Sequence, residues 1–236
     1  MNKKTWVVFI IICIVILGGL VFLSQRGRVD VSNINQNKII PASQQNGEIA
    51  DHAKGNLKSP VIFVEYGDYQ CPYCGEAYPQ VKKVTTKYLG QITYIFRNFP
   101  LTTLHPNALA AAAAAEAAGI EGKYWQMHDL LYENQNDWAN DSSSQRTSTF
   151  DNYAKQIGLN ETTFNNDMNS QRVQQKINFD RAIGSKVGVT GTPTFFLDGK
   201  QVSQTVAQSA ISGDGSALDA AIASALKAHN IALPKS

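Results

Sequence analysis

A continuous apolar stretch opens the chain. Residues 5–23 read TWVVFIIICIVILGGLVFL, which is 19 residues without a charged side chain. As a helix, this segment measures about 28 Å at about 1.5 Å per residue, enough to cross the apolar layer of a bilayer. Lys3 and Lys4 precede it, so the positive-inside rule predicts that residues 1–28 are a cytoplasmic stub and an uncleaved transmembrane signal anchor. The protein would then cross the membrane once and be anchored in it. The domain that follows the anchor would lie on the extracytoplasmic side, in a periplasm or on a cell surface.

A cleaved signal peptide is the alternative interpretation of this stretch. The apolar core of such a peptide is usually about 7 to 15 residues long and is followed by a small-residue cleavage site. Here the core is longer, and the SQRGR that follows it offers no such site. Cys13 lies in the middle of the stretch, where we interpret it as a small packing or lipid-facing side chain.

Residues 29–50 interrupt the hydrophobic pattern. They are rich in Asn, Gln and Ser and have no sustained apolar period, which is typical of a flexible polar tether. We therefore expect a tether between the anchor and a folded domain over residues 51–236.

Strand and helix patterns alternate in that domain. The predicted elements are, in chain order, a strand at 61–64, a helix at 71–89, a strand at 91–99, a helical block over about 106–185, a strand at 194–197 with an Asp-Gly turn and a further strand, and a last helix from residue 216. Pro72 suits the first position of its helix, where a missing N–H is harmless. The order predicts an α/β fold in which a helical block interrupts a sheet.

Charge and composition narrow the function classes. The formal net charge is +2, but four basic residues within 1–28 leave 17 basic and 19 acidic residues in the remainder, a net charge of −2. No basic patch favours a nucleic-acid partner. Three cysteines in 236 residues exclude a scaffold of many disulfides and a protein with several metal clusters.

The candidate chemistry is concentrated in Cys71-Pro72-Tyr73-Cys74, at the predicted start of a helix. Two cysteines at this spacing can close a disulfide or share a metal ion. Unpaired N–H groups and the helix dipole at a helix N-terminus stabilise a thiolate, which predicts a lowered pKa for the first thiol. We expect Cys71 to be the exposed nucleophile and Cys74, one turn along, to be the buried resolving cysteine.

A structural zinc site is the alternative for this pair. It would need two further ligands, whereas the remaining cysteine lies in the anchor and the four histidines form no ligand pair. We therefore expect no metal, and no cofactor other than a redox-active Cys71–Cys74 disulfide.

Four stretches, in this order, carry a specific resemblance: VIFVEYGDYQCPYC, HPNALAAAAAAEAA, KYWQMHDLLYENQNDW and GVTGTPTFFLDGK. Over about residues 50–230 the chain resembles the DsbA-like thiol:disulfide oxidoreductases of the thioredoxin superfamily, in which a helical domain is inserted into the thioredoxin fold. The resemblance implies that residues 51–236 form one such domain, with a thioredoxin part at about 51–100 and 187–236 and a helical insert at about 101–186.

The resemblance also implies further site residues. Glu65 matches the buried acid of the family's first strand, which in relatives handles the proton of the second cysteine. A carboxylate there faces a desolvation cost that raises its pKa. Pro193 matches the cis-proline opposite the cysteine pair, and Thr192 before it presents backbone groups to which an extended peptide substrate can add.

Other side chains near these motifs have simpler interpretations. Asp68 is close to Cys71 in the sequence, but its expected loop position favours a surface charge. His105, His128 and Trp125 lie in stretches that resemble the insert. We interpret these three as capping or packing residues rather than catalysts.

The expected function is a membrane-anchored, extracytoplasmic thiol:disulfide oxidoreductase that introduces disulfide bonds into unfolded, cysteine-containing secreted or surface proteins. The resemblance implies reoxidation by a membrane partner that passes electrons to quinone, DsbB-like or VKOR-like. The Pro-Tyr dipeptide between the cysteines does not set the reduction potential, so Tyr73 does not reveal whether the chain oxidises or reduces its substrates. A reductase or isomerase of the same fold is therefore an alternative. A non-enzymatic metal-binding module is a further one, disfavoured because no Met or His cluster lies near the cysteines.

Overall fold

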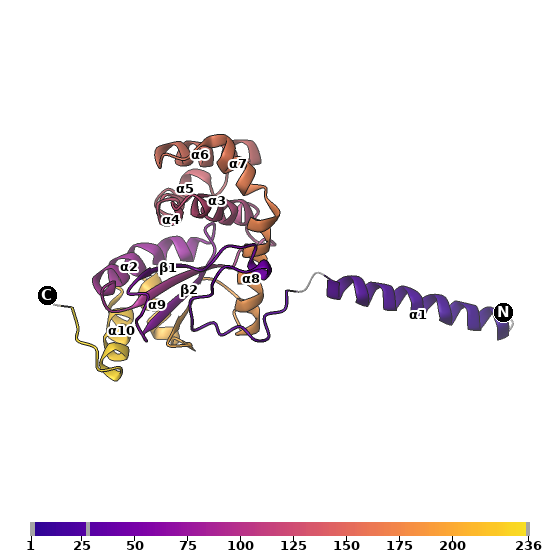
Figure 1. Cartoon of the computed structure of the whole chain (residues 1–236), viewed down its shortest axis with the longest axis horizontal. Coiled ribbons are helices and arrows are strands. Elements are labelled where there is room, and N and C mark those ends of the chain that lie inside the picture. The colour runs from indigo at the N-terminus through magenta and orange to yellow at the C-terminus, as the bar shows by residue number, and fades with distance from the viewer. Residues whose placement is uncertain (1–2, 27–28, 235–236) are drawn as a thin grey trace. The chain divides into compact units, whose positions relative to one another are not determined.

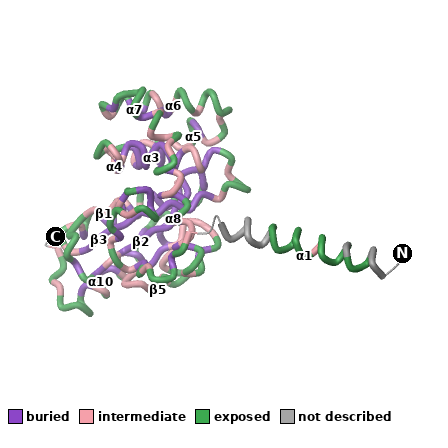
Figure 2. The backbone as a smooth tube through the Cα atoms, turned by 45° about the vertical axis from the view of Figure 1, so that its right-hand side comes forward, coloured by how far each residue is buried: buried purple, intermediate pink, exposed green. Residues whose placement is uncertain are grey.

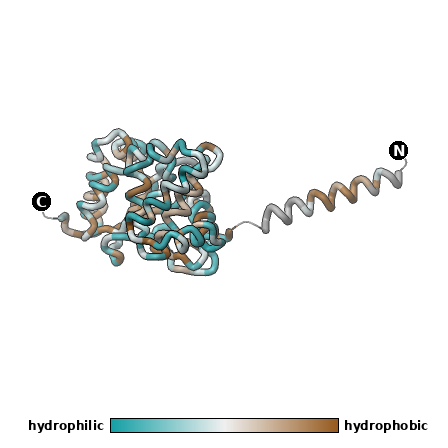
Figure 3. The backbone as a smooth tube through the Cα atoms, turned by 90° about the horizontal axis from the view of Figure 1, so that it is seen from above, coloured by the Kyte–Doolittle hydropathy of each residue, from teal (hydrophilic) through white to brown (hydrophobic). Residues whose placement is uncertain are grey.

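The chain divides into two units. The computed structural model describes residues 3–26 and 29–234, and the units are Met1–Asp30 and Val31–Ser236. The first unit contains helix α1 (Lys3–Arg26), in which the residues with a described burial are mostly exposed. Figure 3 shows the hydrophobic character of its middle part. The second unit contains all the other described helices and strands (Figure 1).

The sequence predicts that residues 5–23 cross a membrane. Over the residues that the structure describes, no helix combines the length and the hydropathy of a membrane-spanning segment. Residues 1–2 and 27–28, which belong to the predicted anchor, lie outside that description. The signal anchor therefore stays a prediction.

A five-stranded sheet forms the centre of the second unit, in the order β1-β3-β2-β4-β5. The strands are β1 (His52–Gly55), β2 (Ile62–Gly67), β3 (Thr93–Asn98), β4 (Thr194–Leu197) and β5 (Lys200–Gln201). β2 and β3 run parallel, and the other neighbouring pairs are antiparallel. The central strands β2 and β3 are almost entirely buried (Figure 2), which is the burial that a continuous apolar run predicts.

The register decides which side chains share a face of this sheet. Glu65 lies opposite Phe96 of β3 and Phe195 of β4, and Lys54 of β1 lies opposite Tyr94 of β3. Because side chains on one face repeat at every second residue, all five belong to the same face. Buried side chains of α2 (Pro72–Tyr88) and α4 (Tyr124–Glu133) pack against it.

A block of helices separates β3 from β4 in the sequence. Besides α4, the described helices there are α3 (Ala108–Ile120), α5 (Gln135–Trp138), α6 (Ser143–Gln156), α7 (Glu161–Met168) and α8 (Gln171–Lys186). Helices α3 to α7 lie together above the sheet in Figure 1. The alanines of α3 are largely buried, and these small side chains let α4, α7 and α8 approach it closely. After β5, α9 (Gln204–Ile211) packs against α2 and α10 (Ser216–Ala228) packs against α9.

The flexible tether predicted over residues 29–50 is wrong from residue 31 onward. Ile40 and Ile49 are buried, and a 3₁₀ turn, η1 (Gln44–Asn46), lies against α8. Residues 31–50 therefore belong to the folded unit, whose boundary lies at Val31.

Backbone groups of this segment explain why it is fixed. The buried Arg97 guanidinium donates hydrogen bonds to the backbone oxygens of Gln36 (2.7 Å) and Lys38 (3.0 Å) and to Asp51 Oδ2 (2.7 Å). A buried cation must have its N–H groups satisfied, and carbonyl oxygens of any residue type can do this. The polar composition of the segment therefore does not reveal that it is ordered.

Candidate active site

The two cysteines of the motif lie at the start of α2. Cys71 precedes the helix, Pro72 is within its first turn, and Cys74 lies one turn along from Cys71. The Cys71 carbonyl accepts hydrogen bonds from the N–H groups of Cys74 and Gly75, both at 3.1 Å. Both thiols are free, and Tyr73 between them is 60% exposed.

Cys71, the first cysteine of the motif, is more buried than the sequence predicted. Cys74 is fully buried, as predicted, but Cys71 is only 3% exposed, so the prediction of an exposed Cys71 is wrong. The reason lies far along the chain: the Thr192 carbonyl oxygen lies 3.3 Å from Cys71 Sγ, and the protonated thiol donates a hydrogen bond to it. The loop before β4 therefore lies against the sulfur, where the resemblance to DsbA-like proteins placed the cis-proline, and it covers Cys71.

The two thiols differ strongly in acidity. A hydrogen bond from the Cys74 thiol is the largest cause that lowers the pKa of Cys71, from 9.0 to about 6. Burial, followed by the interaction with Cys71, raises the pKa of Cys74 well above its ordinary value. Near neutral pH, Cys71 is mostly a thiolate while Cys74 keeps its proton. The pair thus consists of a nucleophile and a protonated partner.

The Thr192–Pro193 peptide bond is cis, as expected for Pro193. β4 begins at the next residue, Thr194, whose hydroxyl donates to the Gly191 carbonyl oxygen at 2.7 Å. Thr192 therefore lies just before a strand, with its own carbonyl oxygen at Cys71 Sγ.

Glu65 lies inside the sheet and is 3% exposed. Burial raises the pKa of Glu65 from 4.5 to about 7, against the opposing effect of a hydrogen bond that the Tyr94 hydroxyl donates to Oε2 at 2.6 Å. The Glu65 charge in turn contributes to the raised pKa of Cys74. The predicted acid is therefore within electrostatic reach of the second thiol.

Asp68 is not the surface charge that its loop position suggested, because it is only 1% exposed. Its Oδ2 accepts a hydrogen bond from the Leu101 N–H (2.9 Å) and pairs with His105 Nδ1 (2.7 Å). Its Oδ1 accepts from the Gln70 N–H at 2.8 Å. These bonds fix the loop that leads from β2 to Cys71, so Asp68 supports the site structurally.

His128 and Trp125 are packing residues, as predicted. His128 is 3% exposed, and its Nδ1 pairs with the Tyr69 hydroxyl at 2.9 Å. Burial lowers the pKa of His128 well below its ordinary value, so the ring is neutral near pH 7. The Trp125 ring lies 5.3 Å from the Tyr94 ring, centroid to centroid.

A family model described as Thioredoxin matches residues 48–213. The chain belongs to the thioredoxin family. The match includes the cysteine motif, Glu65 and the Thr192–Pro193 bond, so the whole candidate site lies within the thioredoxin-family region.

Solved structures of the thioredoxin family share its architecture. A thioredoxin-like oxidoreductase from Silicibacter pomeroyi DSS-3 is 28% identical, with a TM-score of 0.55 over 69% of this chain and 90% of its own. The thiol-disulfide exchange protein alpha-DsbA2 from Wolbachia pipientis is 27% identical, with a TM-score of 0.55 over 68% and 84%. Oxidised BdbD from Bacillus subtilis is 21% identical, and its TM-score of 0.64 over 82% of this chain and 100% of its own shows the shared fold. The resemblance to DsbA-like proteins is confirmed.

Curated relatives carry the same region within longer chains. The Na(+)/H(+) antiporter NhaA 1 of Salinispora arenicola (strain CNS-205) is 40% identical over 151 residues, which are 64% of this chain and 22% of the relative. The NhaA 1 of Mycobacterium sp. (strain KMS) is 34% identical over 155 residues, 64% of this chain and 24% of that protein. The chain thus spans about a fifth to a quarter of the length of these relatives.

Gln135 of α5 is a site residue that the sequence analysis missed. Its Nε2 donates hydrogen bonds to the carbonyl oxygens of Tyr69 (2.7 Å) and Cys71 (2.9 Å). Its side chain also lies against α2, because a Cβ added to Gly75 would clash with Gln135 Oε1. The helical insert is therefore bonded directly to the active-site loop of the thioredoxin fold.

A groove beside the motif lies between the loop after β3 and α5. Its lining is mostly polar and consists of Gln70, Pro72, Leu104, His105, Pro106, Asn107, Gln135, Asn136, Ala139, Asn140 and Asp141. Leu104 is 72% exposed and contributes an apolar side chain to this lining. Because Pro72 belongs to the lining, the groove is continuous with the start of α2.

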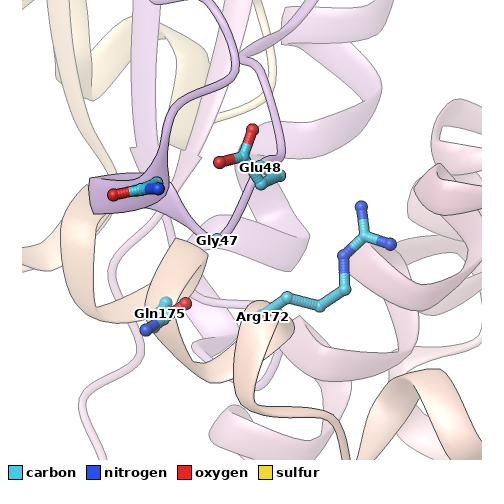
Figure 4. Close-up of a pocket in the computed structure, with 5 residues that line it drawn as sticks. Gly47, Glu48, Arg172 and Gln175 are labelled. Carbon is cyan, nitrogen blue, oxygen red and sulfur yellow. The ribbon is translucent and has the colours of Figure 1, made fainter.

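A different pocket, between η1 and α8, contains none of the predicted site residues. It is lined by Gln44, Gly47, Glu48, Arg172 and Gln175 (Figure 4). Within the part of the chain that the structure describes, no group of three or more His, Cys, Asp or Glu side chains is placed to hold a metal ion. The cysteine pair is the candidate active site because the Thr192 carbonyl oxygen, the cis Thr192–Pro193 bond and the buried Glu65 are associated with it.

Proposed function

We propose that this chain is a thiol:disulfide oxidoreductase that introduces disulfide bonds into unfolded, cysteine-containing secreted or surface proteins. The observation that carries the proposal is the difference between the two thiols of the CPYC motif. Cys71, whose pKa is lowered to about 6, touches the Thr192 carbonyl oxygen, whereas Cys74 is buried with a raised pKa. Stepwise dithiol/disulfide exchange requires one reactive thiolate, here Cys71, next to a second thiol that stays protonated, here Cys74.

In the proposed reaction, a substrate thiolate attacks Sγ of Cys71 in the Cys71–Cys74 disulfide. The S–S bond breaks, and Cys74 leaves as a thiolate that takes a proton from the Glu65 carboxyl group. A second substrate thiolate then attacks the substrate sulfur of the mixed disulfide, forms the substrate disulfide and releases Cys71 as a thiolate. The substrate loses two electrons and the cysteine pair gains them. The low pKa of Cys71 makes it a good leaving group in this last step.

Substrate contact is proposed at the loop before β4. An extended peptide can add its backbone to the Thr192 backbone next to Cys71, as strands add to the edge of a sheet. Thr192 lies two residues before the start of β4, with only Pro193 between them, which supports this arrangement. Recognition through the backbone predicts that many unfolded substrates are accepted.

The proposed setting is extracytoplasmic, with residues 5–23 as a membrane anchor. The support is the sequence: 19 uncharged residues follow two lysines. A membrane partner that passes electrons to quinone, DsbB-like or VKOR-like, would restore the Cys71–Cys74 disulfide. The reaction needs no metal and no further cofactor, because the cysteine pair carries both electrons.

The direction is tested by the reduction potential of the full-length chain, measured by equilibration with glutathione. A stabilised Cys71 thiolate stabilises the reduced form, so we expect an oxidising potential, nearer to about −120 mV than to about −270 mV. A potential near the lower value would instead assign a reductase.

The roles of the two cysteines are tested by trapping. Cys74→Ser should accumulate mixed disulfides between Cys71 and reduced substrate proteins, because no resolving thiol remains. Cys71→Ser is the matched control and should accumulate none. Equal trapping by both variants would overturn the assignment of the nucleophile.

A further inference from the structure

Glu65 has two neighbours that the proposed reaction does not use. The Tyr94 hydroxyl donates a hydrogen bond to Glu65 Oε2 at 2.6 Å. Lys54, on the edge strand β1, lies opposite Tyr94 in the register, and its Nζ is 5.2 Å from the centroid of the Tyr94 ring. Glu65, Tyr94 and Lys54 thus form a row across β2, β3 and β1 on one face of the sheet.

Tyr94 is buried among aromatic side chains. It is 2% exposed, and its ring lies 5.6 Å from that of Phe63 and 5.3 Å from that of Trp125, centroid to centroid. A hydroxyl that donates to a carboxyl oxygen binds the anion more strongly than the neutral acid. The hydrogen bond therefore favours ionised Glu65, and it lowers the pKa of Glu65 against the larger effect of burial.

Lys54 adds a positive charge to the same row. Its Nζ lies 4.0 Å from the centroid of the Trp125 ring, so the ammonium group is held by cation–π contacts with two aromatic side chains. Burial lowers the pKa of Lys54, and the Asp129 carboxylate opposes that effect. The Lys54 charge acts on Glu65 in the same sense as Tyr94 does, by favouring the anion.

We propose that Tyr94 and Lys54 are positioning residues that hold the Glu65 carboxyl group, stabilise its anion and so promote proton transfer from Glu65 to the Cys74 thiolate. In this step the Glu65 O–H bond breaks, the Cys74 S–H bond forms, and the negative charge moves from sulfur to the carboxylate. Tyr94 and Lys54 stabilise the product carboxylate. The inference rests on the proposed function, which supplies the Cys74 thiolate.

Other titratable groups surround this row and must stay constant in any test. They come from β1, α2, the loop after β2, and α4, and are His52, Cys74, Lys82, Tyr69, His128, Asp129 and Tyr132. Cys74 acts directly, because its charge and that of Glu65 disfavour each other. None of these groups is changed in the variants below.

The test compares Tyr94→Phe and Lys54→Met in the reduced, full-length chain. The infrared band of the protonated Glu65 carboxyl group is followed against pH and is assigned by its loss in Glu65→Gln. We expect the midpoint, about 7 in the unchanged chain, to rise by about half to one pH unit in each variant, because each loses a group that stabilises the anion. The pH profile of single-turnover oxidation of a reduced peptide should move in the same direction.

Matched controls separate positioning from general stability. Tyr88→Phe removes the hydroxyl of another buried tyrosine of the second unit, and Lys58→Met removes an exposed lysine near β1. Both should leave the Glu65 midpoint unchanged. An unchanged midpoint in Tyr94→Phe and Lys54→Met would overturn the inference even if the chain exchanges disulfides. A raised midpoint in a chain that exchanges no disulfides would instead overturn the proposed function and leave the positioning roles standing.

Discussion

Glu65 and Asp68 are three residues apart, and both carboxyl groups are buried, yet their surroundings differ. Asp68 accepts hydrogen bonds from two backbone N–H groups and pairs with His105, so both of its carboxylate oxygens have polar partners. Glu65 lies in the register between Phe96 and Phe195 and receives a hydrogen bond from Tyr94. Burial therefore raises the pKa of Glu65 to about 7, which suits an acid that exchanges a proton near neutral pH.

The raised pKa of Glu65 predicts a pH-dependent effect of Glu65→Gln on stability. In the unfolded chain the group ionises at 4.5, whereas in the folded chain it ionises at about 7. The stability associated with neutral Glu65 is complete below pH 4.5 and is lost as the pH rises through 7. Glu65→Gln avoids that loss, so urea unfolding at pH 8 should show the variant to be more stable by about 2 to 3 kcal/mol. At pH 4 the two should be nearly equal; a larger gain there than at pH 8 would contradict the burial argument.

Strong local signals predicted several elements correctly. The Cys-Pro pair marked the start of α2, and the apolar run after residue 60 marked β2, as did TFFL for β4. β1 and α9 were missed. β1 reads HAKG, without a β-branched or aromatic residue, and becomes a strand only because β3 offers it an edge to pair with.

Gln135 of α5 links the helical insert to the loop before α2, and this link can be tested by substitution. Gln135→Ala removes both hydrogen bonds to the carbonyl oxygens of Tyr69 and Cys71, which leaves these part-buried oxygens without that donor. We expect a loss of about 1 to 3 kcal/mol in the free energy of unfolding, measured by urea denaturation. Gln156→Ala, at an exposed position at the end of α6, is the control and should change stability by less than about 0.5 kcal/mol. Equal effects of the two substitutions would contradict a bonded insert.

A buried ionic network joins distant parts of the second unit. Arg97 of β3 pairs with Asp51 at 2.7 Å, and Lys176 of α8 contacts Asp51 at 3.4 Å and Asp180 at 2.6 Å. All four side chains are completely buried. Arg97 also binds backbone oxygens of residues 36 and 38, so the network fixes the segment before β1 onto the sheet and α8.

Removing one member of this network should be costly. Asp51→Ala leaves Arg97 and Lys176 buried with too few acceptors, and we expect it to lower the free energy of unfolding by about 3 to 5 kcal/mol. Thermal or urea unfolding measures this change. Asp137→Ala, at an exposed position of α5, is the control and should cost less than about 0.5 kcal/mol. If Asp51→Ala proved as mild as the control, the segment before β1 would not be held as described.

The sequence by itself determined the α/β class, the helical block between two sheet-forming parts and the cysteine pair at a helix start. These features depend on local spacing, capping and apolar period, which are properties of neighbouring residues. The resemblance to DsbA-like proteins, not local pattern, assigned Glu65, Thr192 and Pro193. Only the tertiary structure decided that residues 31–50 are fixed, that Asp68 and Cys71 are buried, and that Tyr94, Lys54 and Gln135 surround the site. The reason is physical: hydrogen bonds to backbone oxygens and the register of strands depend on which distant segments pack together, and residue type does not encode that directly.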